Sequence, residues 1–152
     1  MLYLSLPFVW LAIAGSTAIP DEFPTQPKNQ LTVTVNGFRT QEGQICLSLF
    51  DSEAGFPTGG ERAVATQCVE LEETTPAITF DLPVAGDYAV AVFHDANGDG
   101  TLNVNMLGIP REGFGFSRNP RISMRPPKFE DAAVAVNGES NIEIRLKYIF
   151  GS

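Results

Sequence analysis

Hydrophobic and polar residues alternate along most of this chain, a pattern typical of β-strands whose two faces differ. Such runs predict strands over residues 31–35, 44–50, 64–71, 77–82, 87–93, 131–136 and 141–148. The run 87–93 is apolar on both faces, which predicts a strand at the centre of a sheet. No segment predicts a long helix, and a single helical turn is expected at 51–57.

Turn residues indicate how the strands connect. Asn36-Gly37 follows the first run and predicts a hairpin with the second, while Asn137-Gly138 predicts a closing hairpin between the last two runs. Seven short strands without a long helix predict an all-β fold, an antiparallel β-sandwich of immunoglobulin-like or transthyretin-like type. A chain of 152 residues accommodates one such domain, which we place at residues 30–149.

The first 18 residues carry no charged side chain, and residues 2–14 form an apolar run of the length found in signal peptides. Ser16 and Ala18 fit a small-residue cleavage site, which predicts a signal peptide at 1–18 and a proline-containing linker at 19–29. Because no Lys or Arg precedes the run, an uncleaved anchor is the alternative. We expect an extracytoplasmic location, periplasmic or secreted, with no membrane span after cleavage.

Export makes the two cysteines informative, because oxidising compartments favour disulfides. Cys46 lies within the strand run 45–49 and Cys68 within 65–71, each on the face opposite to the apolar residues. A cross-strand disulfide on the outer surface requires this shared parity. We therefore predict a Cys46–Cys68 bridge.

An acidic, glycine-containing segment follows the run 87–93. Asp95, Asn97 and Asp99 place oxygen side chains at alternate positions, and Gly100 follows at the sixth place, as in the first half of an EF-hand loop. The sequence predicts one weakly bound Ca²⁺. The expected ligands are the side chains of Asp95, Asn97, Asp99 and Asn103 and the carbonyl of Thr101.

This loop departs from an EF-hand at its twelfth place, where Met106 stands instead of a bidentate Glu. The flanking helices of an EF-hand are also absent, so affinity should be weak or completed by another residue. The alternative is a metal-free turn, because Asn97-Gly98 and Asp99-Gly100 supply positive φ angles easily.

Residues 94–128 are the longest stretch without strand periodicity, and loops of this length are usually functional or disordered. Its apolar residues favour a packed, ordered loop. These are Met106, Leu107, Ile109, Phe114 and Phe116.

The same loop carries the candidate ligand-binding residues His94, Glu112, Phe114, Phe116 and Arg118. With Phe129, its phenylalanines would form an aromatic platform for a protein, peptide or carbohydrate; the alternative is that they are buried against the sandwich. An enzyme is the competing class. His94 would then act as a general base beside Asp95, giving a hydrolase with Glu112, Ser117 and Arg118 nearby.

The spacing does not favour catalysis, because the chain has one histidine and lacks both a nucleophile elbow and an H-E-x-x-H motif. A non-catalytic binding module is the preferred hypothesis. The net charge of −8 disfavours nucleic acids and anionic membrane surfaces as partners. Within this acidic background, basic residues gather between positions 111 and 128, where they would pair with local carboxylates or receive an anionic group.

The segment HDANGDGTLNVNMLGIPREGFGFSRNP at 94–120 resembles the signature of a family of exported bacterial proteins, domain of unknown function 2141. LFDSEAGFP at 49–57, GDYAVAVF at 86–93 and FEDAAV at 129–134 follow the same family pattern in order. The resemblance implies a β-sandwich over roughly residues 31–147 and an extracytoplasmic location, with no established activity. The family commonly has Asp where this chain has Asn103, so one carboxylate of the candidate cation site is lost.

Overall fold

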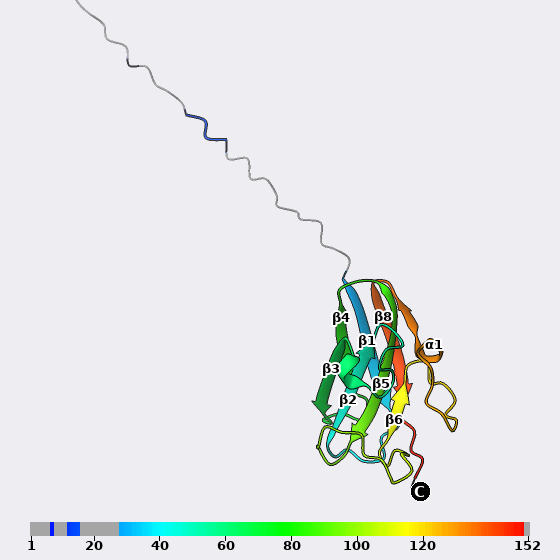
Figure 1. The fold of residues 1–152 in the computed structure, drawn as a ribbon. Helices are drawn as coiled ribbons and strands as arrows, with labels where there is room; N and C mark the ends of the chain where they lie inside the picture. Colours follow the sequence, from blue (N-terminus) through cyan, green and yellow to red (C-terminus); the bar gives the residue numbers. More distant parts are fainter. Residues whose placement is uncertain (1–6, 8–11, 16–27, 151–152) are drawn as a thin grey trace, which may run out of the picture.

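Two β-sheets face each other in the computed structural model, which describes residues 7, 12–15 and 28–150 (Figure 1). The smaller sheet has the order β4-β1-β8. Its central strand β1 (Asn29–Asn36) pairs antiparallel with β4 (Ala77–Leu82) and parallel with β8 (Glu139–Arg145). The predicted antiparallel character therefore has one exception, the β1–β8 pair.

The larger sheet has the order β3-β2-β5-β6, and β7 pairs separately with the start of β5. Its strands are β2 (Gln44–Phe50), β3 (Ala65–Glu70), β5 (Gly86–Asp95), β6 (Phe114–Phe116) and β7 (Val134–Val136). β5 is the longest strand and lies between β2 and β6, which confirms the central position expected from its two apolar faces. The β-sandwich prediction is confirmed.

The predicted pairings of the first two and last two strands are wrong. β1 and β2 lie in different sheets, and so do β7 and β8. The turn at Gly138 does adopt a positive φ of 83°, but its carbonyl accepts a hydrogen bond from Gln30 and its N–H donates to Asn29 at the start of β1. The chain therefore crosses from one sheet to the other at this turn.

Short elements also differ from the predicted boundaries. The expected helical turn at 51–57 is a series of non-helical turns, and a 3₁₀ helix (Gly60–Arg62) follows it. Helix α1 (Phe129–Ala132) occupies the start of the run predicted as a strand at 131–136. β6 has no predicted counterpart, because three residues are too few to establish an alternating pattern.

The core lies between the two sheets and is built from the alternating apolar residues. Leu31, Val33 and Val35 of β1 are completely buried, as are Ile45 and Leu47 of β2. Burying a side chain of this type stabilises the fold by about 1.5–3 kcal/mol. The alternation found in the sequence thus identifies the strand faces that form the core.

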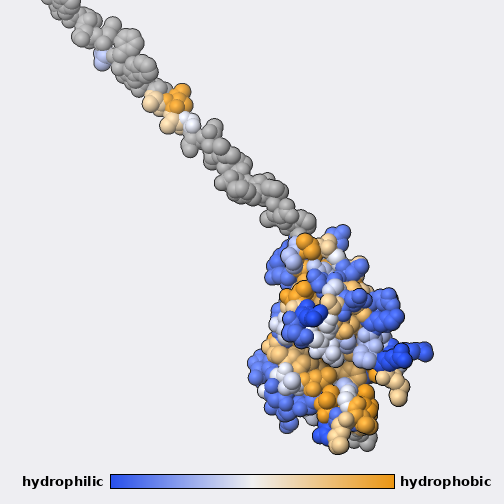
Figure 2. Space-filling model, viewed as in Figure 1, coloured by the Kyte–Doolittle hydropathy of each residue, from blue (hydrophilic) through white to orange (hydrophobic). Residues whose placement is uncertain are grey.

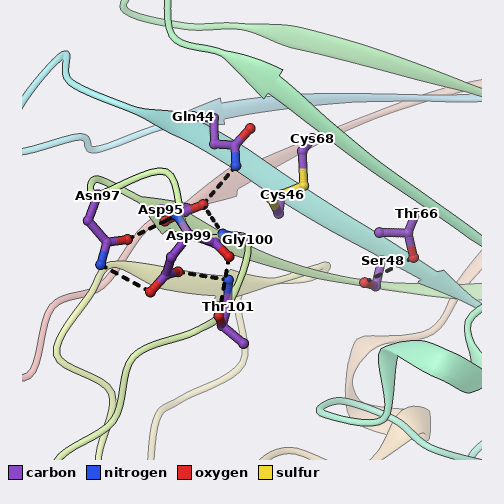
Figure 3. Close-up of a disulfide and its surroundings, with 10 residues drawn as sticks. All are labelled: Gln44, Cys46, Ser48, Thr66, Cys68, Asp95, Asn97, Asp99, Gly100 and Thr101. Carbon is purple, nitrogen blue, oxygen red and sulfur yellow. Dashed lines mark hydrogen bonds between the residues drawn. A yellow bond between two sulfur atoms is a disulfide. The ribbon is translucent and has the colours of Figure 1, made fainter.

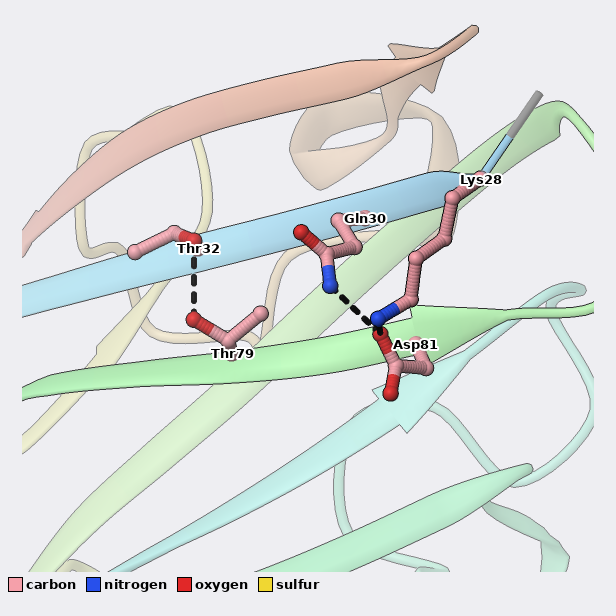
Figure 4. Close-up of polar contacts among 5 residues, drawn as sticks. All are labelled: Lys28, Gln30, Thr32, Thr79 and Asp81. Carbon is pink, nitrogen blue, oxygen red and sulfur yellow. Dashed lines mark hydrogen bonds and ion pairs between the residues drawn. The ribbon is translucent and has the colours of Figure 1, made fainter. Parts of the chain in front are cut away.

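The outer face of the β1–β4 pair is polar, as the other half of the alternation requires (Figure 4). Thr32 and Thr79 share a hydroxyl hydrogen bond of 2.9 Å between directly opposed positions. Asp81 accepts a hydrogen bond from Gln30 and forms an ion pair with Lys28. These contacts lower the pKa of its carboxyl group. All three contacts are solvent-exposed, so each contributes little stability.

The loop 94–128 is not packed throughout. Phe114 is buried, but the side chains of Met106 and Leu107 are almost completely exposed. Figure 2 shows hydrophobic residues gathered at the end of the domain that carries the C-terminus in Figure 1. The exposed large apolar residues of the loop and the C-terminal segment are Val104, Met106, Leu107, Met124, Ile149 and Phe150.

Most of the predicted signal peptide, its cleavage site after Ala18 and almost all of the linker lie outside the described residues. β1 begins at Asn29, one residue before the predicted start of the domain. Within the described ranges, every helix is too short to cross a membrane.

Candidate functional site

Asp95 lies at the last position of β5, where the strand ends and the candidate cation loop begins. Its side chain is completely buried. One carboxylate oxygen accepts hydrogen bonds of 2.7 Å from both the Gln44 amide and the Gly100 backbone N–H, and the other accepts from the Asp99 N–H (Figure 3). Asp95 therefore fixes the loop to the edge of the β2–β5 pair.

Asp99 is exposed and accepts hydrogen bonds from the rest of the loop. Its Oδ2 accepts from the side-chain amides of Asn97, at 3.1 Å, and Asn103, at 3.0 Å, and its Oδ1 accepts from the Thr101 N–H. The Asn103 hydrogen bond, followed by the Thr101 N–H, lowers the pKa of the Asp99 carboxyl group. The stabilisation given by the ionised group is thus present above the ordinary pKa of an aspartate and is lost as pH falls through the lowered value.

Tight curvature of the loop depends on its glycines. Gly98 and Gly100 have φ angles of 71° and 76°, in the region that glycine adopts without steric cost. The prediction that these two positions need positive φ is confirmed. Both the cation loop and the metal-free turn require this geometry, so it does not distinguish them.

The structure brings together Asp95, Asn97, Asp99, Thr101 and Asn103, the five predicted ligands, through a chain of short hydrogen bonds. The described residues contain no group of three or more His, Cys, Asp or Glu side chains suited to a metal ion. A cation in this loop would therefore depend on amide and carbonyl oxygens as well as on two carboxylates. Rotating the Asn97 and Asn103 amides would exchange their NH₂ groups for oxygens facing Asp99.

Glu112 contacts this loop, although it lies nine positions after Asn103 in the sequence. Its Oε2 accepts a 3.0 Å hydrogen bond from the Asn103 backbone N–H. The antiparallel bridge between Val104 and Pro110 brings it there by folding the intervening chain back on itself. Glu112 thus brings a third carboxylate into contact with the loop, beside those of Asp95 and Asp99.

His94 is buried and both of its ring nitrogens have protein partners. Nε2 donates to the Glu42 carbonyl at 2.7 Å, and Nδ1 is 3.1 Å from the Tyr148 hydroxyl. The ring also makes an edge-to-face contact with Phe38. These contacts describe a structural histidine, and they leave neither nitrogen free to act as a general base.

Tyr148 extends the His94 contacts toward the C-terminal segment. Its hydroxyl accepts a hydrogen bond from the Arg39 N–H, and the Arg39 guanidinium lies 4.3 Å from its ring centroid. Burial raises the pKa of Tyr148, so the hydroxyl stays protonated as a donor at neutral pH. Gly113 lies against this ring, since an added Cβ would be only 2.4 Å from Tyr148.

We expect His94→Ala to lower the free energy of unfolding by about 2 kcal/mol, because it removes a buried ring and leaves the Glu42 carbonyl without its donor. Chemical denaturation measures this loss. Tyr148→Phe serves as the matched variant, since it removes only the hydroxyl and should cost about 1 kcal/mol. A neutral effect of His94→Ala would contradict the structural role.

The phenylalanines of the predicted aromatic platform contact one another. Phe116 makes edge contacts with Phe114 and Phe56, and Phe56 also contacts Phe50 and Phe129. Phe114 is buried, and Phe116 and Phe129 are half-buried. Each ring therefore contacts at least one other phenylalanine, which favours the alternative hypothesis.

The five candidate ligand-binding residues do not form one site. His94 contacts Tyr148, Glu112 contacts the cation loop, and Arg118 is exposed, with its guanidinium 3.3 Å from the Glu130 carbonyl. Phe114 and Phe116 belong to the aromatic cluster. Glu112 and Arg118, the two charged candidates, thus lie at different places on the domain.

Ser117 was named only in the competing hydrolase hypothesis, as a member of a hydrolytic site. Its side chain is completely buried. The hydroxyl accepts a hydrogen bond from the Val90 N–H and donates to the Ala132 carbonyl. Ser117 therefore connects β5 to helix α1 and is unavailable as a nucleophile.

The cysteine prediction is confirmed: Cys46 and Cys68 occupy directly opposed positions of β2 and β3 and form a disulfide (Figure 3). Cys68 is exposed, whereas Cys46 is buried although it lies on the face opposite to Ile45 and Leu47. The expectation that both sulfur atoms lie at the surface is thus correct for Cys68 alone.

The sequence model of a family described as "Uncharacterized protein conserved in bacteria (DUF2141)" matches residues 33–145. This match covers most of the chain and includes both sheets and the candidate cation loop. The chain therefore belongs to this family, as the sequence resemblance indicated. No curated protein matches the chain. No solved structure matches it either.

Proposed function

We propose that this DUF2141 member is an exported, non-catalytic binding module whose loop 94–103 takes up one Ca²⁺ ion. The observation that carries the proposal is Asp95, a buried carboxylate held at the end of the central strand β5. Asp95 accepts from the Asp99 N–H, and the Asp99 carboxylate in turn accepts from the side-chain amides of Asn97 and Asn103 in the same loop. Ca²⁺ binds through such mixed sets of carboxylate, amide and carbonyl oxygens.

Charge and geometry favour calcium over magnesium as the bound ion. Asp95 and Asp99 together neutralise a divalent charge, and Asn97, Asn103 and the Thr101 carbonyl supply neutral oxygens. Ca²⁺ accepts six to eight ligands in a flexible arrangement, whereas Mg²⁺ requires a tight octahedron and loses its water reluctantly. Asn103 and Met106 stand where carboxylates would strengthen the site, so we expect a dissociation constant on the order of 10⁻⁴–10⁻³ M, as in extracellular calcium modules.

The bound ion would order the loop, and the loop would present the surface that contacts an extracytoplasmic protein, peptide or carbohydrate. Four properties support this location and role. The disulfide is typical of an oxidising compartment. The sequence predicts a leader, and the net charge of −8 disfavours nucleic acids. The buried hydrogen bonds of His94 and Ser117 argue against catalysis by either residue.

Thermal melts in EDTA, calcium or magnesium test the calcium proposal. An ion that binds only the folded protein stabilises it by RT ln(1 + [L]/Kd), so about 1 mM calcium should add about 0.4–1.4 kcal/mol. Magnesium should add less. Asp99→Ala should abolish the calcium response while leaving the fold intact, because Asp99 is exposed.

Asp87→Ala is the matched control, since Asp87 is an exposed aspartate at the other end of β5. It should respond to calcium like the native protein. Equal melting temperatures of the native protein in all three solutions would leave the metal-free turn as the correct description. A calcium response that survives in Asp99→Ala would place the ion elsewhere.

A further inference from the structure

A pocket of about 550 Å³ lies between the loop that follows β6 and helix α1. In Figure 1 this loop is drawn in yellow to orange and projects from the side of the sandwich beside α1. Its polar lining includes Arg118, Arg121, Ser123, Arg125 and Lys128. The pocket is separate from the candidate cation loop, because none of the five predicted calcium ligands lines it.

The pocket concentrates positive charge on an acidic protein. It holds four of the chain's ten Lys and Arg residues, while the whole chain has a net charge of −8. Two carboxylates, those of Glu130 and Asp131, also line it. Four positive and two negative charges give the lining a formal balance of +2.

The carboxylates do not neutralise the arginines. Glu130 pairs with Lys128 at 3.4 Å, and Asp131 accepts a hydrogen bond from the Lys128 backbone N–H. Within the described part of the chain, Arg118, Arg121 and Arg125 form no ion pair. Cations gathered in this way repel one another, so an anion that enters the pocket gains from all of them.

The backbone holds Arg118 in an unusual conformation at the pocket wall. Arg118 and Asn119 have φ angles of 63° and 46°, a region that residues other than glycine seldom adopt. The Asn119 side chain maintains this turn, because it accepts from the Arg145 N–H at 2.8 Å and donates to the Glu143 carbonyl at 2.9 Å. Such strain persists where the surrounding structure enforces it, and it is common at binding sites.

Pro120, Pro126 and Pro127 restrict the rest of the loop. Fixed φ angles at these positions reduce the entropy that the loop loses when its side chains close on a ligand. The pocket thus combines guanidinium groups that form no ion pair in the described part of the chain with a restricted backbone.

We infer that this pocket binds a phosphate group carried by a small molecule or a lipid headgroup. The guanidinium group presents planar pairs of N–H donors that match phosphate oxygens, and such charge-assisted hydrogen bonds are stronger than neutral ones. A phosphate dianion also balances the +2 charge of the lining. The chain's overall negative charge opposes long polyanions such as nucleic acids but allows a compact dianion to enter.

The exposed side chain of Met124 can distinguish a lipid phosphate from a soluble one. Its side chain is completely exposed and lies between Arg121 and Arg125 in the chain. A phosphate monoester on a lipid would place Met124 against the hydrocarbon surface while the arginines hold the headgroup. A soluble phosphate ester would leave Met124 in water. The two sources therefore differ in whether Met124 contributes.

The test is an NMR titration of isotope-labelled protein with inorganic phosphate at constant ionic strength, together with flotation on vesicles that contain phosphatidic acid. We expect saturable shifts of backbone resonances from 118 to 131, or saturable binding to these vesicles. The double variant Arg118→Gln/Arg125→Gln should weaken whichever binding is seen by about a hundredfold, roughly tenfold for each guanidinium removed.

Arg62→Gln/Arg111→Gln is the matched control, because it removes the same charge from two exposed arginines outside the pocket and should bind like the native protein. Met124→Ser should reduce vesicle binding alone if the source is a lipid, and should change nothing if the source is soluble. Melting curves check that every variant is folded.

The inference fails if neither inorganic phosphate up to about 10 mM nor the vesicles bind. It also fails if the folded Arg118→Gln/Arg125→Gln variant binds like the native protein, or if both double variants lose affinity equally. The titration and the flotation are carried out in EDTA, because calcium precipitates phosphate and binds phosphatidic acid directly. Without calcium, the test is independent of the proposed cation loop.

Discussion

Replacing Cys46 and Cys68 together by alanine is expected to lower the free energy of unfolding by about 3 kcal/mol. The two residues are 22 positions apart, so the bridge closes a loop of moderate length in the unfolded chain. Its main effect is to reduce the conformational freedom of that unfolded chain. For a domain of this size the loss corresponds to a fall in melting temperature of about 10 °C, measurable by calorimetry.

Ser48 and Thr66 provide a matched control, because they face each other on the same two strands two positions further along (Figure 3). Their hydroxyls are 3.5 Å apart, at the limit of a hydrogen bond. Ser48→Ala/Thr66→Ala should therefore cost less than about 1 kcal/mol. A cysteine variant no less stable than this control would show that the bridge contributes only its cross-strand contact.

The strands were predictable because alternation reports burial, and burial is what the sandwich requires. Leu31, Val33 and Val35 alternate with polar residues, and the structure buries all three. Strand partners were not predictable in the same way. Alternation shows which face of a strand is buried, but it does not identify the neighbouring strand. β1 pairs with β8, which lies far away in the sequence and is not joined to it by a turn.

Turn signals misled the pairing for a specific reason. Asn137-Gly138 indicates where the chain reverses, and the positive φ of Gly138 confirms it. In a sandwich, a reversal can lead back along the same sheet or across to the other one. Here the turn bonds to Asn29 and Gln30 of β1, contacts that lie far away in the sequence. Only the tertiary structure selects between these outcomes.

The tight turn of the candidate cation loop was predictable because its glycines are local features of the sequence. The partners of Asp95 and Asn103 outside the loop were not. Gln44 donates to Asp95 from β2, and Glu112 accepts from the Asn103 N–H after the chain has folded back. His94 and Ser117 resemble catalytic residues in the sequence, yet the structure surrounds both with buried hydrogen-bond partners. The sequence pattern does not show that these two polar residues are buried.

Asp95→Ala is expected to lower the free energy of unfolding by about 3 kcal/mol when measured in EDTA, where calcium plays no part. The substitution removes a completely buried carboxylate and leaves three donors without their acceptor, namely the Gln44 amide and the N–H groups of Asp99 and Gly100. An unpaired donor of this kind costs about 1–3 kcal/mol when water cannot replace the acceptor. Urea denaturation measures the loss directly.

Two further variants separate the anchoring role of Asp95 from cation binding. Asp95→Asn keeps one oxygen acceptor but turns an NH₂ group toward existing donors, so its loss should fall between that of Asp95→Ala and zero. Asp99→Ala should cost less than about 1 kcal/mol in EDTA, because Asp99 is exposed and water can replace its contacts. Equal losses for Asp95→Ala and Asp99→Ala would contradict the anchor. The expected order instead makes Asp95 the residue through which the loop, with or without calcium, is held to the strand β5.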